Sequence, residues 1–418
     1  MNIKNIYRFM LLAVMCMTVV ACYVEKPFPD DEEEQMGEQL PAWQKGYMDI
    51  HHISTGRGDC TFMILPDGTT MMVDAGDLGS GSYEQEIMAR IPYTSRTPGE
   101  WIVRYVEKFL KDASLDSKRL DYLLVTHFHS DHIGCKSNYS IPSNNGEYHM
   151  SGVSYVGNFL NVDELIDRNW PNYDFPYPGV LDNAMMINYR AYLKDRVENH
   201  KLPVTAFEVG TEEQFVLKKA PQDYPGFKIS NIYGNGNLWD RESNTVTFLY
   251  PSNASQDALS NENLHSTVIN VQYGKFGYHC GGDILNNWNI ETLVAEEIGQ
   301  TDVYSADHHA NGTMAAEALA ATTPQVFVIP VWDYYHPQPG PLANMLDRNI
   351  YGDDRLVFAA GMVESNRVRL LDNGQQIKPD GHVVVRVYEG GDEFQMFVLN
   401  DRNNKYDVIY KTDKIASK

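Results

Sequence analysis

Cysteine is scarce in this sequence, with 5 residues among 418. Two of them, Cys16 and Cys22, lie near the N-terminus, so only Cys60, Cys135 and Cys280 remain in the rest of the chain. Three cysteines cannot all pair, which excludes a framework of several disulfides. Each of the three lies in or beside an apolar, strand-like run, where a buried thiol is inert. We therefore expect no catalytic cysteine.

Positive charge is also in short supply. Lys and Arg together number 34 against 56 Asp and Glu, which gives a net charge of −22 at pH 7. The sequence contains no run of basic residues, and a chain this acidic repels a polyanion. Nucleic acid is therefore a disfavoured partner.

A long hydrophobic run is missing as well. The apolar stretch at residues 9–21 is shorter than the about 20 residues that a membrane span needs. Lys4 and Arg8 precede it, as in a secretory signal. Residues 19–22, Val-Val-Ala-Cys, resemble the cleavage site of a bacterial lipoprotein. This resemblance implies lipidation at Cys22 and membrane contact only through that lipid anchor.

The predicted signal peptide covers residues 1–21 and leaves an acidic, flexible tether at 22–45. The tether resembles the export signals of Bacteroides-type surface lipoproteins. The resemblance implies a cell-envelope location after export, either periplasmic or on the outer surface. An ordinary secreted protein that is cut elsewhere is the alternative.

Two common catalytic motifs are absent. The sequence has no Gly-x-Ser-x-Gly, the motif of a serine nucleophile elbow. Residues 56–59, Gly-Arg-Gly-Asp, lack the lysine and the spacing of a phosphate-binding loop, so we interpret them as a turn between two strands. The chemistry must come from other side chains.

Hydrophobic periodicity indicates a layered α/β domain. Residues 47–53, 60–65 and 69–74 have the composition of strands, and 98–113 carry apolar residues at helical spacing before a short apolar strand at 120–126. Strand, helix and strand in this order favour helices packed on a sheet. Later strands are predicted at 266–273, 277–283 and 325–331, with a hairpin at 383–398.

Residues 136–260 are less regular and rich in Asn, Tyr, Pro and Gly, apart from a helical stretch at 183–199. We interpret this segment as an insertion within one domain that spans 46–418. Its aromatic loops, such as 170–179, either wall a substrate pocket or only pack on the core.

The chemistry is concentrated in a few residues after the 120–126 strand, namely His127, His129, Asp131 and His132. Alternate residues of an extended chain project to one side, so the first two histidines can reach one metal ion while the turn brings the other two residues toward a second. Imidazole and carboxylate ligands suit Zn²⁺, with Mn²⁺ or Fe²⁺ as alternatives. Because buried ionisable groups without partners are costly, this cluster indicates a metal site.

Further ligands are expected at later strand ends. Asp283 ends the run 277–283, and His308 and His309 follow the run 304–307. An aspartate placed between two metal ions can bridge them through its two carboxylate oxygens. These three residues are therefore candidates to complete a two-metal site.

The pattern His-x-His-x-Asp-His after an apolar strand, followed by Gly282-Asp283 and a late histidine pair, resembles the metallo-β-lactamase superfamily. Residues 56–59, 66–68 and 72–76 add a likeness to the hydrolase domain of ComEC-type DNA-uptake proteins. The resemblance implies an αββα four-layer sandwich, with the inserted segment between the metal-ligand motifs.

The resemblance also implies roles for individual residues. It places His127 and His129 in metal site one and Asp131 and His132 in site two, with Asp283 bridging the two ions. These assignments are expectations that the three-dimensional arrangement has to meet.

Three further roles follow from the same resemblance. One of His308 and His309 completes site two. Asp74 orients the histidine turn through hydrogen bonds instead of binding metal. His265 is either the remaining ligand of site one or only a neighbour.

The resulting hypothesis is metal-assisted hydrolysis without an organic cofactor. Two zinc ions, or manganese or iron, would lower the pKa of a bound water toward about 7 to supply hydroxide, and Asp131 or Asp283 would orient the nucleophile. The expected substrate is a phosphodiester or a small-molecule ester or lactone, with a β-lactam or amide as a further alternative. A surface lipoprotein that binds a glycan, peptide or partner, with a degenerate or structural metal site, is the alternative from another class.

Overall fold

The computed structural model describes residues 37–79 and 87–418. The predicted signal peptide at 1–21, the lipidation site Cys22 and most of the tether therefore lie outside the described residues. Within the described part of the chain, no helix is both long and apolar enough to cross a membrane.

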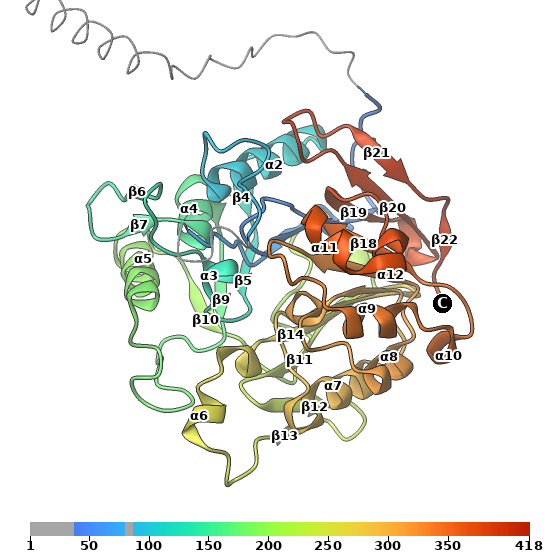
Figure 1. Ribbon diagram of the computed structural model, residues 1–418. Coiled ribbons are helices and arrows are strands. Elements are labelled where there is room, and N and C mark those ends of the chain that lie inside the picture. Colours follow the sequence, from blue (N-terminus) through green and yellow to red (C-terminus); the bar gives the residue numbers. More distant parts are fainter. Residues whose placement is uncertain (1–36, 80–86) are drawn as a thin grey trace, which may run out of the picture. The chain divides into compact units, whose positions relative to one another are not determined.

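Two large β-sheets form the centre of the domain (Figure 1). The first sheet has the strand order β10-β9-β5-β3-β2-β1-β19-β20-β21, and β22 also pairs with β20. Its strands are β1 (Met48–His52), β2 (Thr61–Ile64), β3 (Thr70–Val73), β5 (Tyr122–Val125), β9 (Leu165–Asp167), β10 (Val204–Ala206), β19 (His382–Val387), β20 (Glu393–Leu399), β21 (Val408–Lys411) and β22 (Ile415–Ala416).

The second sheet has the strand order β13-β12-β11-β14-β15-β16-β17-β18. Its strands are β11 (Phe227–Gly234), β12 (Asn237–Asp240), β13 (Thr245–Phe248), β14 (Val268–Tyr273), β15 (Phe276–Cys280), β16 (Val303–Ser305), β17 (Val326–Pro330) and β18 (Leu356–Ala360). Two small ribbons pair β4 (Arg119–Leu120) with β8 (Asn161–Val162) and β6 (Ile141–Pro142) with β7 (His149–Met150).

Helices cover the outer face of each sheet (Figure 1). The first sheet carries α2 (Pro98–Asp112), α4 (Gly152–Phe159) and α5 (Ala184–His200). The second carries α7 (Ile290–Ile298), α8 (Ala316–Thr322), α9 (Pro339–Leu346), α10 (Arg348–Tyr351), α11 (Glu364–Arg369) and α12 (Leu371–Gln376). The short α3 (Ser130–Ile133) and α6 (Gln256–Leu259) lie in loops, as do 3₁₀ turns that include η2 (Glu262–His265) and η4 (Asp307–Ala310).

Side-chain alternation along the strands creates the layers. On β3, Met71 and Val73 enter the core between the two sheets, whereas Met72 enters the outer core beneath α2. On β5, Leu124 faces inward and Leu123 outward in the same way. Because both faces of these strands are covered, apolar residues lie at consecutive positions along them. The predicted αββα four-layer sandwich is confirmed.

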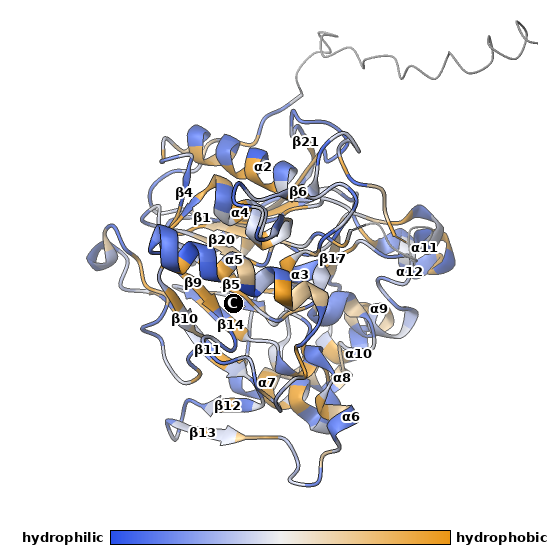
Figure 2. Ribbon diagram, turned by 90° about the vertical axis from the view of Figure 1, so that its left-hand side faces the viewer, coloured by the Kyte–Doolittle hydropathy of each residue, from blue (hydrophilic) through white to orange (hydrophobic). Residues whose placement is uncertain are grey.

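Helix α2 shows why the sequence periodicity was informative. Pro98 occupies the first turn, and the Thr97 side chain accepts a hydrogen bond from the Glu100 backbone N–H at 3.1 Å. Its buried face includes Trp101, Ile102 and other apolar residues at helical spacing. Figure 2 shows hydrophilic and hydrophobic colouring side by side on this helix.

Parallel pairing places the functional loops at common sheet edges. In the first sheet β3 runs parallel to β5, so the residues that follow both strands emerge together. In the second sheet β15 runs parallel to β16, with the same consequence for the loops at 281–284 and 306–310. The metal-ligand candidates come from these loops.

Two boundaries differ from the sequence interpretation. The tether is predicted to run to residue 45, but Gln39 bridges to Asp407, and Leu40 and Trp43 are buried in the outer core. Two isolated apolar residues give no periodic pattern, so the sequence did not indicate this contact.

The segment 136–260 is not an excursion from the core. Strands β9 and β10 extend the first sheet beyond β5, and β11 to β13 form one side of the second sheet. Apart from β11, which has eight residues, these strands have three or four residues and so carry too few alternating positions to be recognised in sequence. The predicted helix at 183–199 is confirmed as α5, with Asn183 accepting a hydrogen bond from the Met186 backbone N–H.

Candidate metal centre

The turn after β5 carries the first set of ligand candidates. Residues 126–129 connect β5 to α3, which contains Asp131 and His132, and His129 has an extended backbone at the start of that helix. The Asp131 carbonyl accepts a hydrogen bond from the Asp59 backbone N–H at 2.7 Å. Glycine is required at Gly58 and Gly76, because a Cβ at either position would lie 2.4 Å or less from that carbonyl oxygen. The two glycine-containing loops therefore fix the turn.

The first ligand group consists of His127, His129 and Asp283. Nε2 of His127 lies 3.2 Å from Nδ1 of His129 and 3.6 Å from Oδ2 of Asp283. Two atoms that are each about 2.1 Å from a tetrahedral zinc ion are separated by about 3.4 Å, so this spacing suits zinc.

The second group consists of Asp131, His132, Asp283 and His309. Nε2 of His132 lies 3.2 Å from Oδ1 of Asp283, and Nε2 of His309 lies 3.4 Å from the same oxygen. Oδ2 of Asp131 lies 3.2 Å from Nε2 of His309. Asp283 therefore offers one oxygen to each group, which is the arrangement expected of a bridging carboxylate.

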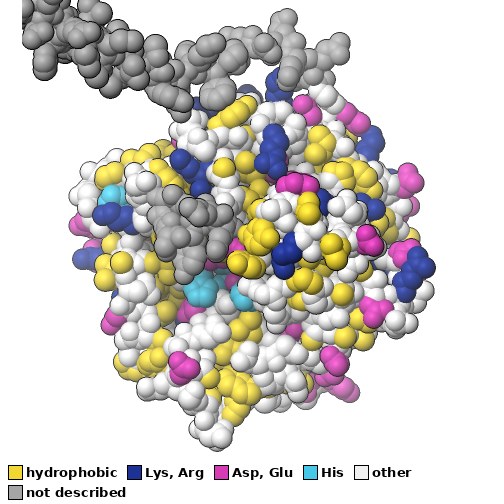
Figure 3. Space-filling model, viewed as in Figure 1, with side chains coloured by type: hydrophobic (Ala, Val, Ile, Leu, Met, Phe, Trp, Pro, Cys, Tyr) yellow, Lys and Arg dark blue, Asp and Glu magenta, His cyan; other side chains and the backbone are white. Residues whose placement is uncertain are grey.

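The donor atoms have the chemistry of an ion-binding site. Nε2 of His132 and Oδ1 of Asp283 are both buried and have no hydrogen-bond partner in the described part of the chain. Buried polar atoms are normally hydrogen-bonded, so a cation that binds both atoms accounts for the exception. Histidine side chains gather at a hollow on the face drawn in Figure 3.

Electrostatics also favour a cation here. Burial opposes protonation of His309, but the carboxylates of Asp283 and Asp131 raise its pKa to about 10. Burial likewise opposes protonation of His132, whose pKa the same carboxylates and Asp74 raise well above its usual value. The potential at the second group is therefore negative, and it stabilises positive charge.

Asp74 has the geometry expected of an orienting residue. Its Oδ2 lies 2.8 Å from Nδ1 of His132 and accepts a hydrogen bond from the Thr126 hydroxyl at 2.6 Å, while Oδ1 accepts the Thr126 backbone N–H at 2.8 Å. A histidine held through Nδ1 directs Nε2 toward the centre. Asp74 itself belongs to neither ligand group.

The 3₁₀ turn η4 separates the two late histidines. His308 and His309 both have positive φ angles, 48° and 55°. His309 joins the second ligand group, whereas Nε2 of His308 lies 3.0 Å from the amide nitrogen of Asn263. Of the two late histidines, His309 is therefore the one that lies with the other ligand candidates.

His265 is not brought to the ligand groups. Its Nδ1 lies 2.8 Å from the Tyr250 hydroxyl and its Nε2 lies 2.9 Å from the Leu259 carbonyl oxygen. Burial and the nearby Arg168 lower its pKa to about 4. Of the two alternatives, the geometry fits a neighbour rather than a ligand.

The family model of the metallo-beta-lactamase superfamily matches residues 54–136, which include Asp74 and the turn from His127 to His132. The matched region is about a fifth of the chain, and it holds the first set of ligand candidates. A comparison with curated proteins found no match.

Several solved structures are similar to the chain at low identity. A mutant of CmlA beta-hydroxylase is 15% identical with a TM-score of 0.39, and the match covers 75% of this chain and 52% of that one. A putative metal-dependent hydrolase from Parabacteroides distasonis is 12% identical with a TM-score of 0.31, covering 79% and 91% respectively. The metallo-beta-lactamase fold protein YhfI from Bacillus subtilis is 10% identical with a TM-score of 0.34, covering 80% and 95%. The chain spans about half the length of the hydroxylase.

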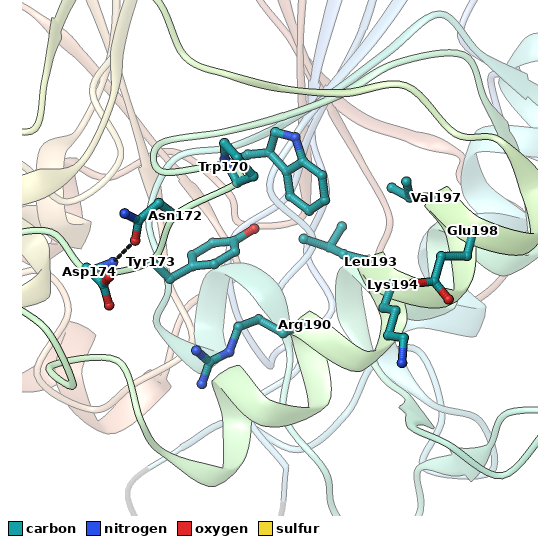
Figure 4. Close-up of a pocket in the computed structure, with 10 residues that line it drawn as sticks. Trp170, Asn172, Tyr173, Asp174, Arg190, Leu193, Lys194, Val197 and Glu198 are labelled. Atoms are coloured by element: carbon teal, nitrogen blue, oxygen red, sulfur yellow. Dashed lines mark hydrogen bonds between the residues drawn. The ribbon is translucent and has the colours of Figure 1, made fainter.

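The domain also has a cleft of about 450 Å³ away from the ligand groups (Figure 4). Trp170 and Tyr173 line it from the loop after β9, opposite Arg190 and Lys194 of α5. None of the metal-ligand candidates lines this cleft. The aromatic loop thus forms a cleft, but not around the metal centre. The aromatic loop contacts the turn that carries the ligand candidates through Tyr173, whose ring centroid lies 5.6 Å from that of Phe128.

Two supporting residues of the domain were missed by sequence analysis. Glu262 is buried and accepts hydrogen bonds from the Phe128 backbone N–H and from Arg168, so it supports the stretch between His127 and His129. Asp307 is buried between His279 and the Tyr304 hydroxyl, directly before the late histidines. For Asp307, its place directly before the two histidines was the only hint of this role in the sequence. Neither Glu262 nor Asp307 belongs to a recognisable motif.

Proposed function

We propose that this protein is a metal-dependent hydrolase that acts on an ester-type substrate, either a phosphodiester or a small-molecule ester or lactone. The observation that carries the proposal is that Asp283 contributes one carboxylate oxygen to each of two adjacent ligand groups. Two zinc ions suit these groups best, with manganese or iron as alternatives. When bound, the metals would lower the pKa of water toward about 7 and polarise the substrate's carbonyl or phosphoryl oxygen.

The chain's own residues hold and orient the reactants. Asp131 and Asp283 face the centre from different loops, where a carboxylate oxygen can position the attacking water and accept its proton. Asp74 and Glu262 fix the turn that carries the ligands. His129 is only half-buried, so the centre is accessible to substrate on that side.

Other proposed properties rest on sequence patterns alone. They are the likeness to ComEC-type hydrolase domains, export through the signal at 1–21, and attachment to the cell envelope by a lipid at Cys22. The acidic charge supports a substrate other than nucleic acid.

Metal content by elemental mass spectrometry is the first test. Protein purified without chelator should contain about two equivalents of zinc, manganese or iron. The loaded protein should then hydrolyse a member of a panel that contains bis(p-nitrophenyl) phosphate, p-nitrophenyl acetate, a lactone and a β-lactam. Two bound metals without hydrolysis of any of them would support the binding-protein alternative.

A matched pair of histidine variants tests the ligand assignment. His129→Ala should lower metal content and activity together, because His129 belongs to the first ligand group. His265→Gln should leave metal content unchanged, since both of its ring nitrogens have other partners. Loss of metal in the His265 variant alone would contradict the assignment.

A further inference from the structure

Metal-binding histidines are usually oriented by a partner at the ring nitrogen that faces away from the metal. Nδ1 of His132 lies 2.8 Å from Asp74, and Nδ1 of His127 lies 3.2 Å from the Thr126 hydroxyl. His309 differs, because its Nδ1 is buried and has no hydrogen-bond partner in the part of the chain that the structure describes. A different interaction must orient this ring.

Two aromatic side chains from the loop after β17 pack against His309. The ring of His336 is nearly parallel to it, with the ring centroids 4.7 Å apart and an interplanar angle of 18°. The indole of Trp332 meets both rings edge-on, with its centroid 5.6 Å from His309 and 4.8 Å from His336. A parallel ring on one face and a perpendicular ring beside it restrict rotation of the His309 imidazole.

The backbone of His336 is itself held in place. Its backbone carbonyl accepts a hydrogen bond from the Asn366 side-chain amide Nδ2 at 2.5 Å, and the Asn366 side-chain oxygen Oδ1 accepts one from Nε of Arg369 at 2.8 Å. Asn366 and His336 are both buried, the latter with 3% of its surface exposed. Helix α11 is thereby connected through His336 to the second ligand group.

We propose that His336, backed by Trp332, is a positioning residue that holds His309 in the orientation needed for the second metal site. Ring packing takes the place of the hydrogen bond that orients His132. The proposal rests on the proposed metal centre, and it assigns a role to residues outside both ligand groups. Because no ligand of the first group stacks on His336, the effect should be confined to the second site.

The test compares His336→Leu with His336→Phe in the full chain. The affinity of each metal equivalent is measured by competition with a chromogenic chelator, and the coordination of each site by the absorption spectrum after cobalt substitution. Leu should weaken one of the two equivalents about 10-fold, the size of effect typical of an outer partner of a ligand. Phe keeps a flat ring for stacking and should stay within about 2-fold of the wild type.

His382 provides a matched control. It is a buried histidine outside the ligand groups, and its ring centroid lies 4.6 Å from that of Tyr105. His382→Leu should leave both metal affinities unchanged. If His336→Leu weakens both equivalents equally and lowers the melting temperature as His382→Leu does, His336 has only a scaffold role and the proposal is overturned.

Two further outcomes separate this proposal from its premise. If Phe loses the second metal as fully as Leu while His336→Asn retains it, a ring nitrogen is needed, and positioning by stacking is wrong. If the wild-type protein binds two metals and no His336 variant alters either affinity, the positioning role fails while the metal centre stands. A wild-type protein that takes up no metal after reconstitution would overturn the centre itself.

Discussion

The protein buries two groups of histidines that differ in what faces their rings. His127, His132 and His309 face the carboxylates of Asp131 and Asp283. The core histidines, which are His51, His52 and His382, face mainly neutral groups. Nδ1 of His51 lies 2.9 Å from the Tyr105 hydroxyl, Nδ1 of His52 lies 3.3 Å from the Thr61 hydroxyl, and Nδ1 of His382 accepts the Ser54 backbone N–H.

The side chains that surround each buried histidine decide whether its pKa is raised or lowered. Burial lowers the pKa of His52 and of His382 to about 3, and that of His51 to about 4 despite the nearby Asp49. At the metal centre burial acts in the same direction, but two carboxylates reverse the outcome for His132 and His309. A buried histidine alone therefore does not mark a cation site, whereas several histidines that converge on the same carboxylates do.

The largest effect is expected from removing the shared carboxylate. Asp283→Asn leaves a similar shape but removes the one carboxylate that both ligand groups share, so both metals should be affected. A direct ligand should cost more than the about 10- to 100-fold that an outer partner costs. Metal titration of the variant measures this loss. Retention of two tightly bound metals would contradict the bridging role.

A smaller loss is expected when the partner of a ligand is changed. Asp74→Asn keeps the hydrogen-bonding shape but removes the charge that orients His132, and metal affinity should fall by about 10- to 100-fold. The measurement is a chelator competition at fixed pH. Asp401→Asn is a suitable control, because Asp401 is a buried carboxylate that bonds to Ser54 and not to a metal-centre residue.

The core histidines predict acid sensitivity of the fold. Their folded pKa values lie below the unfolded value of 6.5, so the unfolded chain takes up protons first as the pH falls. The free energy of unfolding should therefore be highest above about pH 6.5 and should decrease as the pH falls toward 4. Each of these histidines should lower it by about 1.5 kcal/mol between pH 6.5 and 5.

Denaturant unfolding of the metal-free protein at several pH values measures this slope. His52→Gln should reduce the slope, because a neutral amide does not titrate. His200→Gln serves as the control for a surface position, because the His200 side chain is 55% exposed. If the free energy of unfolding depends on pH equally in the His52 variant and the wild type, His52 does not cause the acid sensitivity and this prediction is wrong.

The smallest effect is expected at His308. Its neighbour His309 belongs to the second ligand group, whereas His308 contacts Asn263. His308→Gln should therefore keep its metal content, and His309→Gln should lose one equivalent. Elemental analysis of the two variants in parallel decides which histidine is the ligand, and the reverse pattern would refute the geometry.

Local pattern made part of the fold and of the site predictable. The strand at 120–126 is followed directly by the cluster from His127 to His132, so both can be recognised from adjacent residues in the sequence. Asp283 and the late histidine pair were found because each follows an apolar run, as ligands at strand ends do. By contrast, β9 and β10 have three residues each, and their place in the first sheet depends on partners far away in sequence.

The sequence by itself determined the layered α/β class and the ligand types, because side-chain periodicity and metal preference are local properties. Only the tertiary structure decided between His308 and His309, placed His265 away from the ligand groups, and stacked His336 on His309. These outcomes depend on backbone angles in η4, on the contacts of His265 with Tyr250 and Leu259, and on the approach of the His336 loop to His309. None of these is encoded in the spacing of the residues concerned.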